Sequence, residues 1–506
     1  MALCVGTMTF ALALLAQNWF LEIKAPSAGS GSAFLLGVVM HGGASVLLLA
    51  GLQQACVGEV LRIAGTAAIV LQVVRDSFFS LSVGALVILA TGCPALGALA
   101  FRTRTLLALF AGAWLVGCLL GPDGASVFRH ASRPSGAATR WLIEAPAPGI
   151  VARKSVSEPL ASGILAVDAM VPVGRGQREL VVGDRQTGKT AIGLDTPLNQ
   201  SGLGVLCFLA AVGQKATSTF KACLALASHG AFWYASVWMS SASASAVSQY
   251  LAPYTACGAA EFFMWARRSP CFVCYDDLSR HAGAYRELSL LLRRPPGREA
   301  FPGEIFFVHS RLLERSCKLH FGLGGGSITA FPVIETLAGD VSGYIVSNVI
   351  SITDGQIFLS TDLFLSRIRP AVDVGLSVTR VGSAAQTASM KQVGGAYKIE
   401  LAQYFELQAF SQFASDIGAE TQLRLARGVR LVALLTQSAG NPLSTTQQVR
   451  ALCLANQGFY PRSCFVRSGT QELRGLRVLI LTLPEWLSIG CNSKSICSSL
   501  TKSLQP

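Results

Sequence analysis

Short apolar runs alternate with glycine-rich turns and longer segments through the middle of the chain, from about residue 110 to residue 388. The runs at 179–182 (ELVV) and 270–275 (PCFVCY) are two of them, and each is followed by a turn and a longer segment. This alternation is typical of an α/β domain built on a parallel sheet. We therefore predict such a domain over residues 110–388.

The two ends of the chain have different patterns. From about residue 389, alanine, leucine, glutamine and glutamate dominate, and in residues 398–435 the apolar positions recur about every 3.6 residues, which predicts helices. We assign residues 389–506 to a helical domain, although the pattern weakens after residue 457. Residues 1–109 are apolar and rich in glycine and alanine, with short β-branched runs such as 68–74. These runs predict a β-rich domain.

The first domain also contains a membrane-span candidate. Residues 77–101 carry no charged side chain, and their length and apolarity would suit a transmembrane helix. The alternative is a β-rich domain with very apolar strands. The sequence leaves both interpretations open.

Composition argues against two classes of function. The net charge is +13, but the basic residues are dispersed and no basic stretch is interleaved with aromatic residues, so we expect no nucleic-acid binding. The 14 cysteines show no zinc-like spacing with histidines. Cys271 and Cys274 form a CxxC, but they lie in a predicted strand, where residues three apart point to opposite faces. We expect both to be buried small hydrophobes.

The stretch GDRQTGKT has the spacing G-x-x-x-x-G-K-[ST], which cradles nucleotide phosphates. It follows a predicted strand at residues 179–182, and residues 190–198 after it are predicted to start a helix. Backbone N–H groups of the loop would face the phosphates, Lys189 would contact the β/γ oxygens and Thr190 would bind Mg²⁺. We therefore predict binding of ATP or ADP with Mg²⁺ by Gly183, Asp184, Arg185, Gln186, Thr187, Gly188, Lys189 and Thr190.

Three further residues have predicted roles around the phosphates. Asp276 ends an apolar strand and is the expected carboxylate on the magnesium side, with Asp277 as its neighbour. Gln214 ends another strand, where a carboxylate could polarise the attacking water, but an amide is no useful base near neutral pH. The site is therefore expected to bind nucleotide without fast turnover. Arg380 is a candidate arginine finger, supplied in trans to a neighbouring subunit.

Four stretches resemble the α subunit of the rotary F-type ATP synthase. They are residues 175–190, 275–316, 347–364 and 368–386, and the resemblance is dense from about residue 142 to residue 435. It implies a RecA-like P-loop nucleotide-binding core with an N-terminal β-barrel domain and a C-terminal α-helical bundle. It also implies a ring of three α and three β subunits, which works with γ and δ subunits and is peripheral to a membrane.

The resemblance assigns roles to matching residues. It implies a non-catalytic site that keeps Mg-ATP bound, with Gln214 where β subunits carry the catalytic glutamate. Arg380 matches the finger that reaches into the catalytic site on β, and Ser377 matches a position needed for activity. The adenine pocket is implied to include Phe364, Arg369, Pro370 and Gln437.

Several positions depart from the family pattern. Ala439 stands where a second pocket glutamine is expected, and Thr379 replaces a serine. Pro197 falls where an aliphatic residue of the helix after the loop is usual, and a proline deep in a helix costs roughly 3 kcal/mol. Gly325 and Val346 replace a usual Glu and Pro. The apolar first hundred residues and the weakly charged last fifty also depart; a divergent lineage, an altered translation or a membrane attachment would each account for them.

The subfamily and location are expectations from the resemblance. The stretch between the loop and AVGQK lacks the insertion usual in mitochondrial members, and no transit peptide is evident. We expect the stromal side of the chloroplast thylakoid membrane, with the cytoplasmic side of a bacterial plasma membrane as the alternative. The competing functions are a RecA-like helicase or translocase ring, a secretion or archaeal-type rotary ATPase subunit, and a degenerate remnant.

Overall fold

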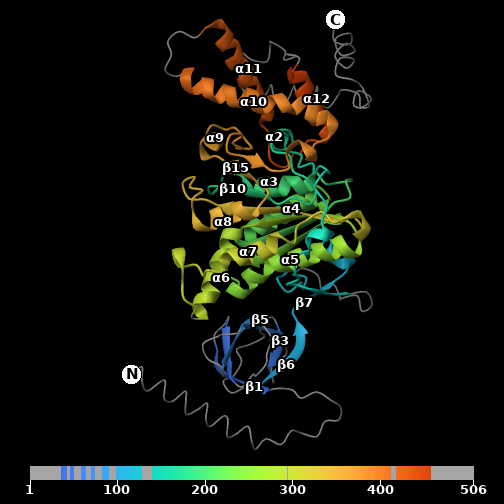
Figure 1. Cartoon of the computed structure of the whole chain (residues 1–506), viewed down its shortest axis with the longest axis vertical. Helices are drawn as coiled ribbons and strands as arrows, with labels where there is room; N and C mark the ends of the chain where they lie inside the picture. The colour runs from blue at the N-terminus through green and yellow to red at the C-terminus, as the bar shows by residue number, and fades with distance from the viewer. Residues whose placement is uncertain are drawn as a thin grey trace, which may run out of the picture. The chain divides into compact units, whose positions relative to one another are not determined.

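The computed structural model describes residues 36–42, 46–50, 59–63, 70–74, 82–89, 99–127, 139–292, 294–411 and 418–456. The chain divides into two compact units: the first ends at Ala108 but also includes Ser245–Ser248 and Tyr285–Pro295, and the second contains the rest. Figure 1 colours the described elements along the chain. The last fifty residues, whose pattern departs from the family, lie outside the described residues.

The first unit contains antiparallel strands that pair into a closed barrel, in the order β1-β2-β5-β4-β3-β6. The described residues of the uncharged segment 77–101 belong to β5 and β6. The strand bounds are β1 Leu36–Gly42, β2 Val46–Ala50, β3 Glu59–Ile63, β4 Val70–Val74, β5 Ser82–Leu89 and β6 Leu99–Leu106.

The second unit is built on an eight-stranded sheet in the order β16-β15-β10-β14-β13-β11-β12-β8. Its strands are parallel except β16, which runs antiparallel to β15. The central strands β10, β14, β13 and β11 are mostly apolar and almost entirely buried, as expected where helices cover both faces of a parallel sheet. The bounds are β8 Leu119–Leu120, β10 Glu179–Gly183, β11 Leu206–Gln214, β12 Ala235–Ser241, β13 Pro270–Asp276, β14 Ser327–Glu335, β15 Gly355–Leu359 and β16 Val378–Thr379; β7 Ala108–Ala111 and β9 Thr139–Leu142 form a separate pair.

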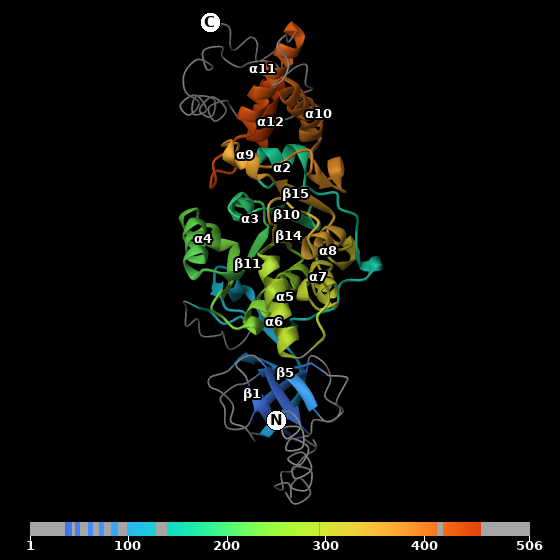
Figure 2. The same ribbon diagram turned by 90° about the vertical axis from the view of Figure 1, so that its left-hand side faces the viewer.

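Helices α3 and α4 lie on one side of this sheet and α7 and α8 on the other (Figure 2). The predicted α/β class is therefore confirmed. The helix bounds are α2 Leu165–Met170, α3 Lys189–Leu198, α4 Ala216–Ser228, α5 Ala246–Ala266, α6 Leu278–Leu291, α7 Ile305–Leu313, α8 Tyr344–Ile352 and α9 Thr361–Leu365, with 3₁₀ turns at Ala113–Leu115, Ile150–Ala152, Ala231–Trp233, Arg298–Ala300, Phe321–Leu323 and Gly382–Ala385.

The two cysteines of the CxxC are buried on opposite faces of β13, as predicted. Cys271 Sγ lies 3.6 Å from the carbonyl oxygen of Ala260 in α5. Cys274 Sγ would lie 2.8 Å from a Cβ built on Gly193 in α3. Both thiols are free, and burial raises the pKa of each. Neither cysteine therefore has a partner for metal or redox chemistry in the described structure.

The helix after the phosphate-binding loop begins where the sequence predicts it. Residues 190–198 were expected to start a helix and all lie in α3, which ends at Leu198 with Pro197 in its last turn. Proline has no N–H group to donate to the preceding turn, and the chain turns at once, with the Gln200 N–H donating to the Pro197 carbonyl at 3.0 Å. Pro197 therefore lies close to the end of the helix rather than in its middle.

Three helices follow the sheet: α10 Ala388–Ser411, α11 Ala419–Leu435 and α12 Thr445–Asn456. The Tyr397 hydroxyl on α10 donates to the Leu452 carbonyl on α12 at 2.5 Å, and Leu401, Leu431 and Leu452 join the same buried core as α2. The predicted C-terminal helical domain is confirmed over the described residues. Within them, we find no helix with both the length and the apolarity to cross a membrane.

Candidate functional site

The loop GDRQTGKT lies between the end of β10 and the start of α3, as the motif requires. A Cβ on Gly183 would come within 2.7 Å of the Leu359 carbonyl oxygen, so only glycine fits there. Gly188 has φ +98°, a left-handed conformation that favours glycine. These two glycines allow the backbone to turn tightly so that its N–H groups and the N-terminus of α3 can face one anion.

Lys189 is buried at the base of this loop. Its ammonium donates to the Gly183 carbonyl at 2.9 Å and to the Asp184 carbonyl. Burial lowers the pKa of Lys189, although the carboxylates of Glu335, Asp277 and Asp276 oppose that shift. Phosphate oxygens would supply an anionic partner and compensate for this desolvation.

Neighbouring side chains fasten the loop to the end of β14. The Asp184 carboxylate accepts hydrogen bonds from the Thr336 hydroxyl at 2.6 Å and the Gly339 N–H at 2.8 Å. Burial disfavours its charge, but these hydrogen bonds outweigh burial and the pKa of Asp184 is lowered. Arg185 pairs with Glu335 at 3.1 Å, and Thr187 donates to the Asp184 carbonyl at 2.8 Å.

The two residues predicted on the magnesium side meet across the sheet edge. The Thr190 hydroxyl donates to Asp276 Oδ2 at 2.8 Å, between the start of α3 and the end of β13. Burial raises the pKa of Asp276, and the hydrogen bonds from Thr190 and Gln214 oppose that rise. A hydroxyl and a carboxylate are the hard oxygen ligands that Mg²⁺ prefers. This pair fits the ion that a nucleotide would bring.

Gln214 is the last residue of β11 and lies beside the same edge. Its amide nitrogen donates to the Asp276 carbonyl oxygen at 3.3 Å. A neutral amide can orient a water molecule but cannot accept its proton. Glu335, at the end of β14, is a carboxylate near the loop that our sequence analysis missed. The rule that ligands gather at the carboxyl ends of parallel strands would have found it.

The residues predicted for the adenine pocket line one cavity of about 740 Å³ beside the loop. The Arg369 guanidinium lies over the Phe364 ring at 4.2 Å, and Pro370 follows it in the wall. Gln437 also lines the cavity, but backbone groups occupy its amide. Its Oε1 accepts from the Leu165 N–H at 3.3 Å, and its Nε2 donates to the Gly163 carbonyl at 2.9 Å. Gln437 therefore shapes the wall.

Arg380 follows β16 and is exposed. Its backbone N–H donates to the Asp354 carbonyl at 2.9 Å. Its guanidinium makes no hydrogen bond or ion pair within the described part of the chain. Ser377, by contrast, is fully buried, and its hydroxyl accepts from the Phe358 N–H at 2.9 Å. Ser377 thus joins the segment before Arg380 to β15.

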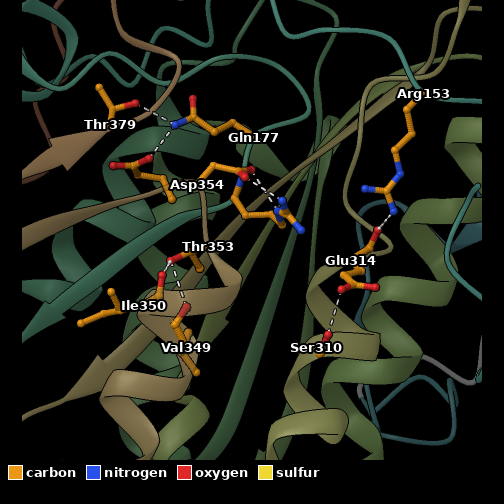
Figure 3. Close-up of polar contacts among 11 residues, drawn as sticks. Arg153, Gln177, Ser310, Glu314, Val349, Ile350, Thr353, Asp354 and Thr379 are labelled. Atoms are coloured by element: carbon orange, nitrogen blue, oxygen red, sulfur yellow. Dashed lines mark hydrogen bonds and ion pairs between the residues drawn. The ribbon is translucent and has the colours of Figure 1, made fainter. Parts of the chain in front are cut away.

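A partly buried polar network lies next to the Arg380 segment (Figure 3). The Gln177 amide points toward Thr379 and donates to its hydroxyl at 2.9 Å, and it donates to Glu179 at 2.6 Å. Burial raises the pKa of Glu179 well above its ordinary value, and the charge of Asp354 adds to that effect. Arg178 pairs with Asp354 at 2.6 Å. The network joins the first residues of β10 to β15 and β16.

Two protein-family models match the chain. Residues 163–379 match the nucleotide-binding domain of the ATP synthase alpha/beta family, and residues 386–463 match the C-terminal domain of the ATP synthase alpha/beta chain. Together they cover more than half of the 506 residues. The first match contains the phosphate-binding loop, Gln214 and Asp276, and the second contains Gln437.

Proposed function

The chain belongs to the ATP synthase alpha/beta family as an F-type subunit, and from that premise we propose that it is the alpha subunit, which holds Mg-ATP without hydrolysing it quickly. The observation that carries the proposal is Gln214. It lies beside the carbonyl of Asp276, where a catalytic subunit needs a carboxylate, and it carries a neutral amide instead.

The residues of this site have binding roles in the proposal. The loop N–H groups and Lys189 hold the phosphates, Thr190 and Asp276 hold Mg²⁺, and Phe364 and Arg369 flank the base. Bound Mg²⁺ neutralises charge on the phosphate oxygens. Without a base to take the proton of water, the nucleotide remains intact.

Arg380 serves a different site in this proposal. An exposed guanidinium with no partner in the described chain is free to enter the catalytic site of a beta subunit. There an oxygen of ADP attacks phosphate and water leaves, and a fixed positive charge stabilises the in-line transition state. The proton gradient drives this reaction through the rotor of the proton-translocating enzyme.

The proposed partners are beta subunits in an alternating ring and the gamma and delta subunits. The proposed location is the stromal side of the chloroplast thylakoid membrane, peripheral to it, with the cytoplasmic side of a bacterial plasma membrane as the alternative. Both follow from the sequence resemblance.

Co-expression of this chain with plastid-type beta and gamma subunits tests the proposal. We expect Mg-ATPase activity that collapses in Arg380→Ala and persists in Arg424→Ala, which removes an exposed arginine of a surface ion pair on α11. Unchanged activity in Arg380→Ala would refute the assignment of Arg380 as the arginine finger.

A second measurement separates alpha from beta. The chain alone is incubated with Mg-ATP and passed through a desalting column, and the retained nucleotide is identified. We expect retained ATP. Accumulation of ADP would show that this site has its own catalytic base and would contradict the role of Gln214.

A further inference from the structure

One face of α3 runs along the nucleotide pocket away from the loop. Gly188, Ala191, Ile192 and Asp195 all line the cavity, and their spacing places them on a single helix face. Asp195 lies seven residues beyond Gly188, which corresponds to about 10 Å along the helix axis. That separation places Asp195 beyond the phosphates, at the depth where the base of a bound nucleotide would lie.

The Asp195 carboxylate is held on one side and open on the other. Its Oδ1 accepts from the Gly440 N–H at 2.8 Å. Its Oδ2 has no hydrogen-bond donor in the described part of the chain. The residue is 8% exposed. A hydrogen-bond donor from a ligand would stabilise a carboxylate oxygen that is so largely removed from water.

Several other polar side chains of the cavity are already engaged. The Gln437 amide bonds to backbone, and the Thr436 hydroxyl donates to the Val432 carbonyl at 3.0 Å. Asn441 donates to Ser438 at 3.1 Å. Ala439, which stands where a second glutamine was expected, offers no polar group. Asp195 is the one carboxylate among the described residues that line the cavity, so its Oδ2 is the charged acceptor for the edge of the base.

We propose that Asp195 determines base specificity, with Oδ2 accepting a hydrogen bond from the exocyclic amine of a 6-aminopurine. This inference rests on the proposed nucleotide site and adds a specificity residue to it. A 6-oxopurine would instead place a carbonyl oxygen, an acceptor, toward the carboxylate. Two facing acceptors repel, so the pocket disfavours inosine nucleotides.

The first test needs only the wild-type full chain. Equilibrium dialysis with Mg²⁺ compares ATP with purine riboside triphosphate, which differs from ATP by loss of the 6-amino group. A hydrogen bond to a charged group predicts that ATP binds about ten- to a hundredfold more tightly. Equal affinities would overturn the proposal. If neither nucleotide binds, the proposed function fails and the inference fails with it.

The second test uses Asp195→Asn, which replaces the carboxylate oxygen that faces the pocket with an amide hydrogen-bond donor. The Gly440 N–H keeps the amide oxygen of asparagine on its side, so the amide N–H₂ faces the pocket. We expect the preference for ATP over ITP to reverse. Asp123→Asn is the matched control, because it removes a half-buried carboxylate in a loop that does not line the cavity, and there the preference for ATP should remain. An unchanged preference in folded Asp195→Asn would refute the assignment; if that variant does not fold, the wild-type comparison decides.

Discussion

A buried ion pair fastens α5 to the segment that follows α7, and its removal gives the sharpest stability prediction. Arg315 Nε and Nη2 donate to the two carboxylate oxygens of Glu261, each at 2.6 Å, and Nη1 donates to the Ile143 carbonyl at 2.7 Å. The side chains are only 1% and 2% exposed. Each charge therefore depends on the other for compensation.

The magnitude follows from what each substitution leaves behind. Breaking a buried pair by removing one partner costs about 3–5 kcal/mol. Glu261→Gln keeps one acceptor for Arg315, so we expect about 3 kcal/mol. Arg315→Met leaves the Glu261 carboxylate with the Trp141 indole N–H at 3.4 Å, and we expect about 5 kcal/mol. The double variant leaves no unpaired charge and should cost at least about 2 kcal/mol less than the sum.

Native-state hydrogen exchange of the α5 amides is the suitable assay, because it measures local opening free energy in a chain of two compact units. Glu420→Gln is the control: it breaks the exposed pair with Arg424 on α11 and should change stability by no more than about 0.5 kcal/mol. A loss below about 1 kcal/mol in Glu261→Gln, or strict additivity in the double variant, would refute the reasoning.

Three other predictions concern titration and binding. Burial lowers the pKa of His309 to about 4. Between about pH 6.5 and pH 4 the unfolded chain binds a proton that the native state does not bind, so the free energy of unfolding falls as pH drops through this range. His309→Gln should remove about 3 kcal/mol of that loss, as measured by urea unfolding at a series of pH values. Burial raises the pKa of Glu179, so wild-type stability declines as pH rises above the ordinary value of 4.5; Glu179→Gln should have the higher Tm at neutral pH and no advantage below pH 4.5, and an equal difference at both pH values would contradict this. Lys189→Met removes the charge at the base of the loop and should weaken Mg-ATP binding about a hundredfold in equilibrium dialysis; unchanged affinity would exclude the loop as the phosphate site.

Sequence alone predicts the centre of this site because its geometry is local or follows from strand order. The motif dictates a strand, a tight loop and a helix, and the structure has β10, the loop and α3 in that order. Asp276 and Gln214 end neighbouring parallel strands, whose carboxyl ends share one edge of the sheet. Thr190 and Asp276 are therefore adjacent although 86 residues separate them.

Other features depend on tertiary neighbours that no local pattern reveals. Gln437 bonds to backbone because residues 163 and 165 happen to pack against it, and Ser377 is buried because β15 lies beside its segment. The sequence pattern marks Asp195 only as a polar position on an amphipathic helix. Its place in the cavity and its bond to the Gly440 N–H depend on the tertiary structure. The end of α3 at Leu198 reflects where the chain turns after Pro197.

Gln214 and Arg380 have complementary roles under the proposed function. In that proposal, a nucleotide site that lacks a base still binds its ligand, so the loop, Lys189 and the Thr190–Asp276 pair retain a role without turnover. The exposed guanidinium of Arg380, which has no partner in the described chain, adds nothing to the stability of the fold. The buried Gln177 and Ser377, by contrast, make hydrogen bonds that hold the segment carrying Arg380 against the sheet. Under the proposed function the ligand of this exposed charge is the nucleotide on a beta subunit, and each alpha chain then completes a reaction centre that it does not contain.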